Sequence, residues 1–173
     1  MKIILAIGAR NKLTGQIGEH LVSAMLGTLG FYATPYSGNV PGFDITAVNS
    51  KTLQAFPIQI KTSNGGELVH STIDKWVEHH IKDDNSQYLG DLLKLANPKK
   101  IWVMVQLKDN ILSSARYFIC TEAQIQEKIV TRYRNFMAKH NHRRPGGGAS
   151  TQAVLNVKNM LEFENNWKIL NDY

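Results

Sequence analysis

The sequence predicts an α/β fold in which a mixed β-sheet is flanked by helices. Two observations carry this prediction. Segments with helical spacing of apolar residues alternate with short apolar runs, and residues 101–107 are apolar almost throughout, which is typical of a strand buried on both faces. The expected order is helix, three strands, helix, strand, strand, helix. Such an order is typical of a sheet covered by helices.

The length of 173 residues suits a single domain with a sizeable hydrophobic core. The apolar run at residues 3–7 is too short for a secretory signal or a membrane span, and it predicts an N-terminal strand. Cys120 is the only cysteine, so an internal disulfide is excluded. Its place in an apolar run predicts a buried thiol, and the expected location is the cytoplasm.

The first helix is predicted over residues 12–29, where apolar side chains recur every three to four residues. Thr14 is a candidate cap near its start, and Gly30 stands where a C-terminal cap is expected. Strands at residues 31–36, 43–48 and 56–62 follow, separated by turn-forming residues.

Residues 67–84 show no clear preference, whereas residues 85–96 predict a helix that ends at Asn97-Pro98. Strands are expected at residues 101–107 and 115–120. The core of the domain is therefore expected over about residues 12–120.

Residues 121–173 predict a C-terminal helical extension. Thr121 is expected to cap a long helix that ends near His140. A basic, glycine-rich loop follows at residues 139–150, and a short helix is expected near residues 162–170. The three tryptophans are expected to pack in the interior rather than stack on bases: Trp76, Trp102 and Trp167.

Three polar residues stand on neighbouring predicted strands. Gln59 and Lys61 share one face of strand 56–62, because side chains alternate along a strand. Asp44 lies near the start of the preceding strand, and a hairpin between the two strands would bring it close to Gln59. Aspartate is disfavoured inside strands, and a bound metal ion is one reason for its presence there.

These residues resemble a known family pattern. The run at 41–45 (Pro-Gly-Phe-Asp-Ile), followed by Gln59-Ile60-Lys61, resembles the motif of PD-(D/E)XK, or restriction-endonuclease-like, nucleases. The segment Gly-Gln-Ile-Gly-Glu at 15–19 is similar to the first helix of Mrr-like and Holliday-junction-resolvase-like members. The resemblance covers roughly residues 12–107 and implies a restriction-endonuclease-like mixed sheet flanked by helices.

The resemblance also implies a role for each matching residue. Asp44 would be the principal ligand of Mg²⁺ or Mn²⁺, and Lys61 would be the catalytic lysine. Gln59 stands in the place of the usual Asp or Glu, Glu19 would be an additional ligand, and the backbone carbonyl of Ile60 would complete the coordination. Metal-bound oxygens and a lysine can neutralise phosphoryl charge and activate water, as phosphodiester hydrolysis requires.

Gln59 departs from the common motif. An amide oxygen can ligate a metal, but it brings no negative charge and cannot act as a base. The substitution weakens the affinity for Mg²⁺ or shifts the burden to Glu19. Mrr-like members are similar to this Gln-x-Lys form.

The net charge of +6 favours polyanionic partners. Thr62 and Ser63 directly follow the motif and are candidates to hydrogen-bond phosphates. Tyr36 and Asn39 lie in the loop before the motif and could touch the substrate. The densest basic cluster could follow a nucleic-acid backbone without reading bases: Lys139, Arg143 and Arg144. Thr62 and Ser63 can equally be ordinary polar residues at a strand end, and the basic cluster can equally be part of a solvated loop.

The leading hypothesis is a metal-dependent endonuclease acting on DNA. One alternative is a non-catalytic nucleic-acid-binding module that retains the fold, and Gln59 is its main support. Another is a partner subunit of a larger system. A homodimer or a partner protein could select the target, and no membrane association is expected.

Overall fold

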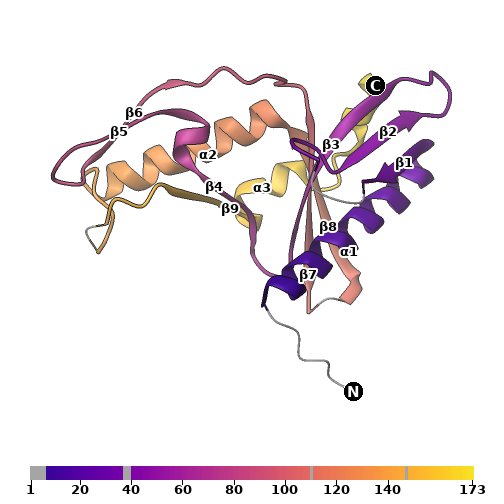
Figure 1. Ribbon diagram of the computed structural model, residues 1–173, viewed down its shortest axis with the longest axis horizontal. Helices are drawn as coiled ribbons and strands as arrows, with labels where there is room; N and C mark the ends of the chain where they lie inside the picture. Colours follow the sequence, from indigo (N-terminus) through magenta and orange to yellow (C-terminus); the bar gives the residue numbers. More distant parts are fainter. Residues whose placement is uncertain (1–6, 37–39, 110, 147) are drawn as a thin grey trace.

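The computed structural model describes residues 7–36, 40–109, 111–146 and 148–173. Within them, the chain forms a mixed five-stranded sheet in the order β1-β2-β3-β7-β8, together with the two-stranded ribbons β4-β9 and β5-β6 (Figure 1). The strands of the large sheet are β1 (Phe31–Pro35), β2 (Ile45–Asn49), β3 (Ala55–Ser63), β7 (Ile101–Lys108) and β8 (Ile111–Thr121). The α/β class predicted from the sequence is confirmed.

The strands β1, β2 and β3 form an antiparallel meander, and β7 then pairs with β3 in parallel. A parallel pair needs a crossover connection, which is usually helical. Here the connection consists mostly of strands, with one short 3₁₀ helix. Its elements are β4 (Glu67–Thr72), η1 (Ile73–Lys75), β5 (Val77–Ile81) and β6 (Gln87–Leu92).

The prediction of a helix at residues 85–96 is therefore wrong. Half of that segment is β6, which pairs with β5 in the register His80↔Tyr88. Its leucines have helical spacing, and its partner strand β5 lies in the preceding stretch, residues 67–84, whose sequence shows no clear preference. The carbonyl of Leu93 accepts a hydrogen bond of 2.8 Å from Gln126 Nε2, so tertiary contacts also fix the end of this segment.

Helix α1 (Ile7–Thr28) packs on one face of the large sheet (Figure 1). Val22 and Leu26 on its inner face are fully buried. The helix begins earlier than predicted, so Thr14 lies inside it and is buried rather than capping it. Gly30 follows the helix with φ +88°, a conformation that favours glycine, so the predicted C-terminal stop is confirmed.

Helix α2 (Glu122–Lys139) lies against the opposite face, and it begins directly after Thr121, the cap that the sequence predicts. The Thr121 hydroxyl accepts from Gln124 N–H, and the Gln124 side chain accepts from Thr121 N–H, which is a capping box. In the described parts of the chain, no helix is both long and apolar enough to span a membrane.

Strand β7 separates two hydrophobic clusters. Ile101 and Val103 contribute to the cluster under α1, whereas Trp102 and Met104 contribute to the cluster under α2. The prediction of a strand buried on both faces is thus confirmed. Cys120 pairs with Trp102 across β7 and β8, is fully buried, and has a thiol pKa raised by desolvation.

The C-terminal third is less helical than expected and belongs to the same core. Strand β9 was not predicted; it pairs with β4 and buries Leu155 under α2. The helix expected near residues 162–170 is replaced by short turns of helix. The elements after α2 are β9 (Gln152–Asn156), α3 (Val157–Met160), η2 (Leu161–Phe163) and η3 (Trp167–Asp172). The strand expected at residues 3–7 falls mostly outside the described residues, and Ile7 begins α1.

Candidate functional site

Asp44 stands directly before β2, fixed between two neighbouring strands. Its backbone N–H donates to the Ile58 carbonyl at 2.9 Å, and its own carbonyl accepts from Tyr36 N–H at 3.1 Å. These bonds continue the pairing of β1 with β2 and of β2 with β3 by one residue. The position of the side chain is therefore set by the sheet rather than by a loop.

The Asp44 carboxylate accepts two hydrogen bonds from β3. Oδ2 accepts from the Ile60 backbone N–H at 2.6 Å and from Gln59 Nε2. The hairpin thus brings Asp44 to Gln59, as the sequence predicts. Since a carboxylate only accepts, the amide nitrogen of Gln59 must face it, and the Gln59 carbonyl oxygen stays available to another partner.

Glu19 on α1 lies close enough for the charge of Asp44 to act on it. The pKa of Glu19 is raised, first by partial burial and then by the Asp44 carboxylate, while His20 opposes the shift. The helix can approach the sheet here because residue 18 is glycine. A Cβ on Gly18 would lie only 2.9 Å from Thr62 Cβ on β3.

Lys61 follows on β3 and is exposed. Together with Gln59 it lines a cavity of about 350 Å³ between the large sheet, β4 and η1. The structure thus brings Asp44 and Gln59 together, places Glu19 within range of the Asp44 charge, and holds Lys61 at the cavity that Gln59 also lines. We call these four residues the Asp44 site.

The cavity contains basic groups that sequence reasoning missed. Its lining includes His70 of β4 and Lys75 of η1 beside Lys61. Glu122 also lines it, but its carboxylate forms an ion pair of 2.6 Å with Lys100. No sequence signal marked Lys75 or His70, because residues 67–84 gave no structural preference. The cavity therefore presents more positive than negative charge to a ligand.

The oxygens of the Asp44 site suit a hard divalent cation. Glu19 and Asp44 supply carboxylate oxygens, and Gln59 Oε1 and the Ile60 carbonyl are neutral donors of the kind that Mg²⁺ accepts. No cluster of three or more His, Cys, Asp or Glu side chains suited to a metal occurs in the part of the chain that the structure describes. A cation here would rest on two carboxylates, and it would relieve the repulsion between them.

The predicted phosphate contact of Thr62 does not fit its position. Thr62 shares the face of β3 that carries Ile58 and Ile60, so its hydroxyl is turned toward α1 at Gly18. Oγ1 is buried and has no hydrogen-bond partner within the described residues. The alternation of side chains along the strand was the signal that would have excluded it. Ser63, one residue further, is half-buried at the end of β3.

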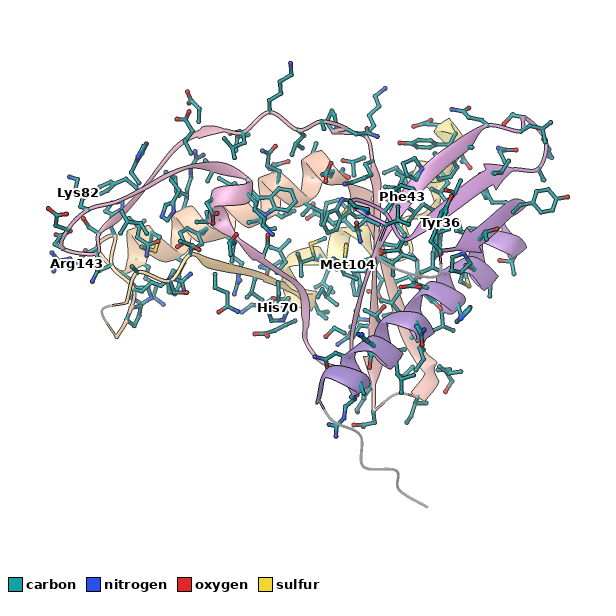
Figure 2. All side chains as sticks on the ribbon, viewed as in Figure 1. Tyr36, Phe43, His70, Lys82, Met104 and Arg143 are labelled. Carbon is teal, nitrogen blue, oxygen red and sulfur yellow. The ribbon has the colours of Figure 1, made fainter. Side chains whose placement is uncertain are left out.

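The basic cluster at the end of α2 lies away from the Asp44 site. Helix α2 has 18 residues and is therefore about 27 Å long. Glu122 at its first turn lines the cavity, whereas Lys139 ends the helix. Figure 2 shows Arg143 at the far end of the molecule from Phe43, the neighbour of Asp44. Arg143 forms an ion pair with Asp84 there.

Two further predicted contacts have separate outcomes. The Tyr36 hydroxyl is hydrogen-bonded to Thr46 Oγ1 at 3.1 Å, so it is tied to β2. Asn39 lies outside the residues that the structure describes. The tryptophans behave as expected, because Trp76 and Trp102 are only 6% and 8% exposed.

Comparison with known proteins finds no match among family models, curated sequences or solved structures.

Proposed function

We propose that this protein is a metal-dependent endonuclease that hydrolyses phosphodiester bonds in DNA. One observation carries the proposal: the Asp44 carboxylate is held by Ile60 N–H and Gln59 beside a second carboxylate, with Lys61 on the same strand. The resemblance of these residues to the PD-(D/E)XK motif points the same way, as does the mixed sheet. The finer assignment to a restriction-endonuclease-like fold is part of this proposal.

Each residue has a chemical task in this proposal. Asp44 and Glu19 would hold Mg²⁺ or Mn²⁺, with the Gln59 and Ile60 oxygens completing the set. The ion supplies positive charge to the phosphoryl oxygens and makes bound water more acidic. Lys61 neutralises charge that develops on the phosphoryl group and orients the attacking water. Gln59 keeps the Asp44 carboxylate aimed by donating to Oδ2.

The cavity next to Lys61 supports a polyanionic substrate. Lys75 and His70 converge on it from the crossover connection, and Lys100 neutralises the Glu122 carboxylate in its wall. These groups can hold phosphates on either side of the bond that is cut without contacting bases. They add phosphate contacts that the motif itself does not contain.

A second candidate is a nucleic-acid-binding module without catalysis, and the position of Gln59 favours it. The amide donates a hydrogen bond to Asp44, whereas a carboxylate at this position would add a negative charge for a metal ion. In that case the basic cavity still binds nucleic acid, and the binding weakens with salt. A partner subunit that lacks both properties is the remaining alternative.

Plasmid cleavage with Mg²⁺, with Mn²⁺ and with EDTA tests the endonuclease. Wild type is expected to nick DNA only with metal. Asp44→Asn keeps an acceptor for Ile60 N–H, and Gln59 can turn its carbonyl to the new amide, so the fold is spared. Both Asp44→Asn and Lys61→Ala are expected to lower the rate about 100-fold or more, because each removes charge that stabilises the transition state.

Lys51→Ala is the matched control. Lys51 is an exposed lysine in the turn between β2 and β3, away from the carboxylates, and its removal is expected to leave the rate unchanged. Equal cleavage by Asp44→Asn and wild type would disprove the endonuclease. Retention of DNA at low salt without cleavage by any metal would instead favour the binding module.

A further inference from the structure

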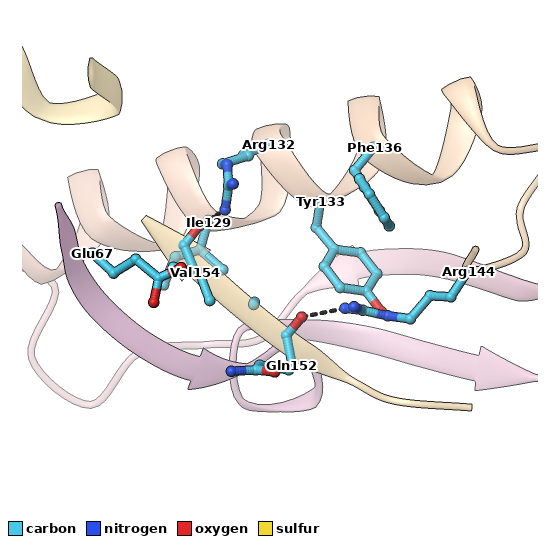
Figure 3. Close-up of a pocket in the computed structure, with 9 residues that line it drawn as sticks. Glu67, Ile129, Arg132, Tyr133, Phe136, Arg144, Gln152 and Val154 are labelled. Carbon is cyan, nitrogen blue, oxygen red and sulfur yellow. Dashed lines mark hydrogen bonds between the residues drawn. The ribbon is translucent and has the colours of Figure 1, made fainter. Parts of the chain in front are cut away.

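A second cavity lies between α2 and β9, with Glu67 of β4 at one end (Figure 3). It encloses about 200 Å³, less than a typical drug-sized site but more than one phosphate ion occupies. One face of α2 forms its wall, at the i, i+3, i+4, i+7 spacing of a single helical face. These residues are Ile129, Arg132, Tyr133 and Phe136.

Two arginines reach into this cavity and bind the free edge of β9. Arg132 Nη1 donates to the Val154 carbonyl, and Arg144 Nη2 donates to the Gln152 carbonyl. These carbonyls are two residues apart on one strand, so they are separated by roughly 6–7 Å. Both guanidinium groups therefore lie along the same edge of β9, and both line the one cavity.

Most of the donors on these guanidinium groups are not used by β9. Each guanidinium has five N–H donors, and a single bond to a strand carbonyl uses one of them. The Nε of Arg144 is buried and has no hydrogen-bond partner among the residues that the structure describes. A buried donor without an acceptor is unfavourable, and it indicates a bound ion, water or ligand that completes it.

Aromatic rings fix the position of Arg144. Its guanidinium lies 5.3 Å from the centre of the Tyr133 ring and 5.4 Å from that of Phe136. The Tyr133 hydroxyl is itself held by Gln87 Oε1 at 2.5 Å. The cation is therefore oriented before any ligand arrives, which lowers the entropic cost of binding.

The charge of the cavity selects an anion. Arg132 and Arg144 contribute two positive charges, and Glu67 contributes the one carboxylate among the lining residues. Figure 3 shows Glu67 at the opposite end from Arg144. The Glu67 carboxylate is exposed and lies 3.2 Å from His70 Nε2. A ligand beside Arg144 therefore meets a guanidinium group at the end of the cavity that lies away from the Glu67 carboxylate.

We propose that the cavity between α2 and β9 binds a phosphoryl group through Arg132 and Arg144. Planar guanidinium forks match phosphate oxygens and are suited to bidentate bonds with them. The remaining space is bordered by Phe136, Ala153 and Val154, so a small attached group can be accommodated. This site is independent of the proposed endonuclease, because none of the residues of the Asp44 site lines it.

Calorimetric titration with inorganic phosphate and with a nucleoside 5′-monophosphate, at ionic strength matched by chloride, tests the site. Wild type is expected to bind both saturably. Arg144→Gln is expected to weaken binding about ten-fold or more, because a charge-assisted pair of bonds is lost. Lys51→Gln, which removes an equal charge from an exposed residue of the turn between β2 and β3, is expected to change nothing.

Ala153→Met provides the second variant. The longer side chain fills the cavity while both arginines remain. This variant is therefore expected to lose phosphate binding, and the loss cannot be due to a change in charge. Unfolding of each variant in urea establishes that it is folded. Absence of saturable binding to wild type would overturn the site, as would equal binding by wild type and both cavity variants. Asp44→Asn should bind phosphate normally, which separates this site from the endonuclease.

A DNA oligonucleotide with and without a 5′-phosphate identifies the source of the phosphoryl group. With EDTA present, a preference of about five-fold or more for the phosphorylated end, lost in Arg144→Gln, assigns the cavity to a nucleic-acid end. Equal retention of the two oligonucleotides, together with saturable binding of the monophosphate, assigns it to a free nucleotide. Both results support the phosphoryl site.

Discussion

Glu19 is a carboxyl group whose ionised form is disfavoured by its surroundings. Burial and the Asp44 carboxylate raise its pKa, so the folded protein binds this proton more tightly than the unfolded chain does. The resulting cost to folding is absent below the ordinary pKa of 4.5 and grows as the pH rises through the raised value. The cost is fully present above the raised pKa.

Glu19→Gln is therefore expected to stabilise the metal-free protein at pH 7 but not at pH 3.5. Urea unfolding at both pH values measures the difference. Adding Mg²⁺ should reverse the order at pH 7, since wild type gains a ligand that the variant holds less well. Glu127→Gln, at an exposed glutamate of α2, is the control and should show neither effect. An identical response of the two variants would contradict this account.

The residues that the sequence could identify are those whose partners lie across one hairpin. Asp44 and Gln59 are joined by β2 and β3, and the alternation of side chains brings the two strands' polar groups together. Lys75 and the cavity it lines could not be found this way. Their arrangement depends on a crossover connection that packs against Trp102 and α2, far away in the sequence.

Contact between α1 and β3 depends on a glycine. A Cβ added at Gly18 would lie 2.9 Å from the Cβ of Thr62. A Cβ added at Gly15, on the same helix, would have no atom within 4 Å. Thr62 is β-branched and stiff, so it cannot move aside cheaply. The helix would have to shift away from the sheet, and Glu19 would move with it.

Gly18→Ala is expected to lower the free energy of unfolding by about 1–3 kcal/mol, as overpacking does. Gly15→Ala should raise it by about 0.5–1 kcal/mol, because alanine favours the helix and meets no neighbour. Urea denaturation monitored by circular dichroism provides both values. A stabilised Gly18→Ala protein would show that α1 does not approach β3 as closely as described.

Local signals predicted α2, β3 and β7 well and failed at β6. Thr121 with Gln124 forms a capping box, and that signal is contained within four residues. Strand β6 is instead held by β5 and by α2, and Leu92 at its end and Leu93 directly after it remain exposed. Helical spacing in a short segment cannot reveal pairing with a strand that tertiary contacts hold in place.

One buried amide joins the crossover connection to helix α2. Gln126 on α2 donates to the Trp76 carbonyl at 2.7 Å and to the Leu93 carbonyl at 2.8 Å. Trp76 and Leu93 flank the open end of the β5-β6 ribbon, where Val77 pairs with Leu92, so a single side chain ties that end of the ribbon to α2. The ribbon in turn follows η1, which carries Lys75 to the cavity.

Gln126→Leu is expected to cost about 1–3 kcal/mol, since it removes the side-chain donor of the Leu93 carbonyl and leaves the Trp76 carbonyl with the Leu93 N–H as its donor. Asn135→Leu makes the same kind of change at an exposed position of α2 and should stay within about 0.5 kcal/mol of wild type. Hydrogen exchange at β5 and β6 should rise in Gln126→Leu. Unchanged exchange there would mean that other contacts hold the ribbon.

The fully buried Cys120 has a practical consequence for labelling. It is the only thiol of the chain, and burial keeps it protonated and out of reach of reagents. A cysteine introduced at an exposed position such as Lys139 would be modified selectively by a maleimide dye, without first removing the native thiol. Fluorescence resonance energy transfer to labelled oligonucleotides could then map how far bound DNA extends from the Asp44 site.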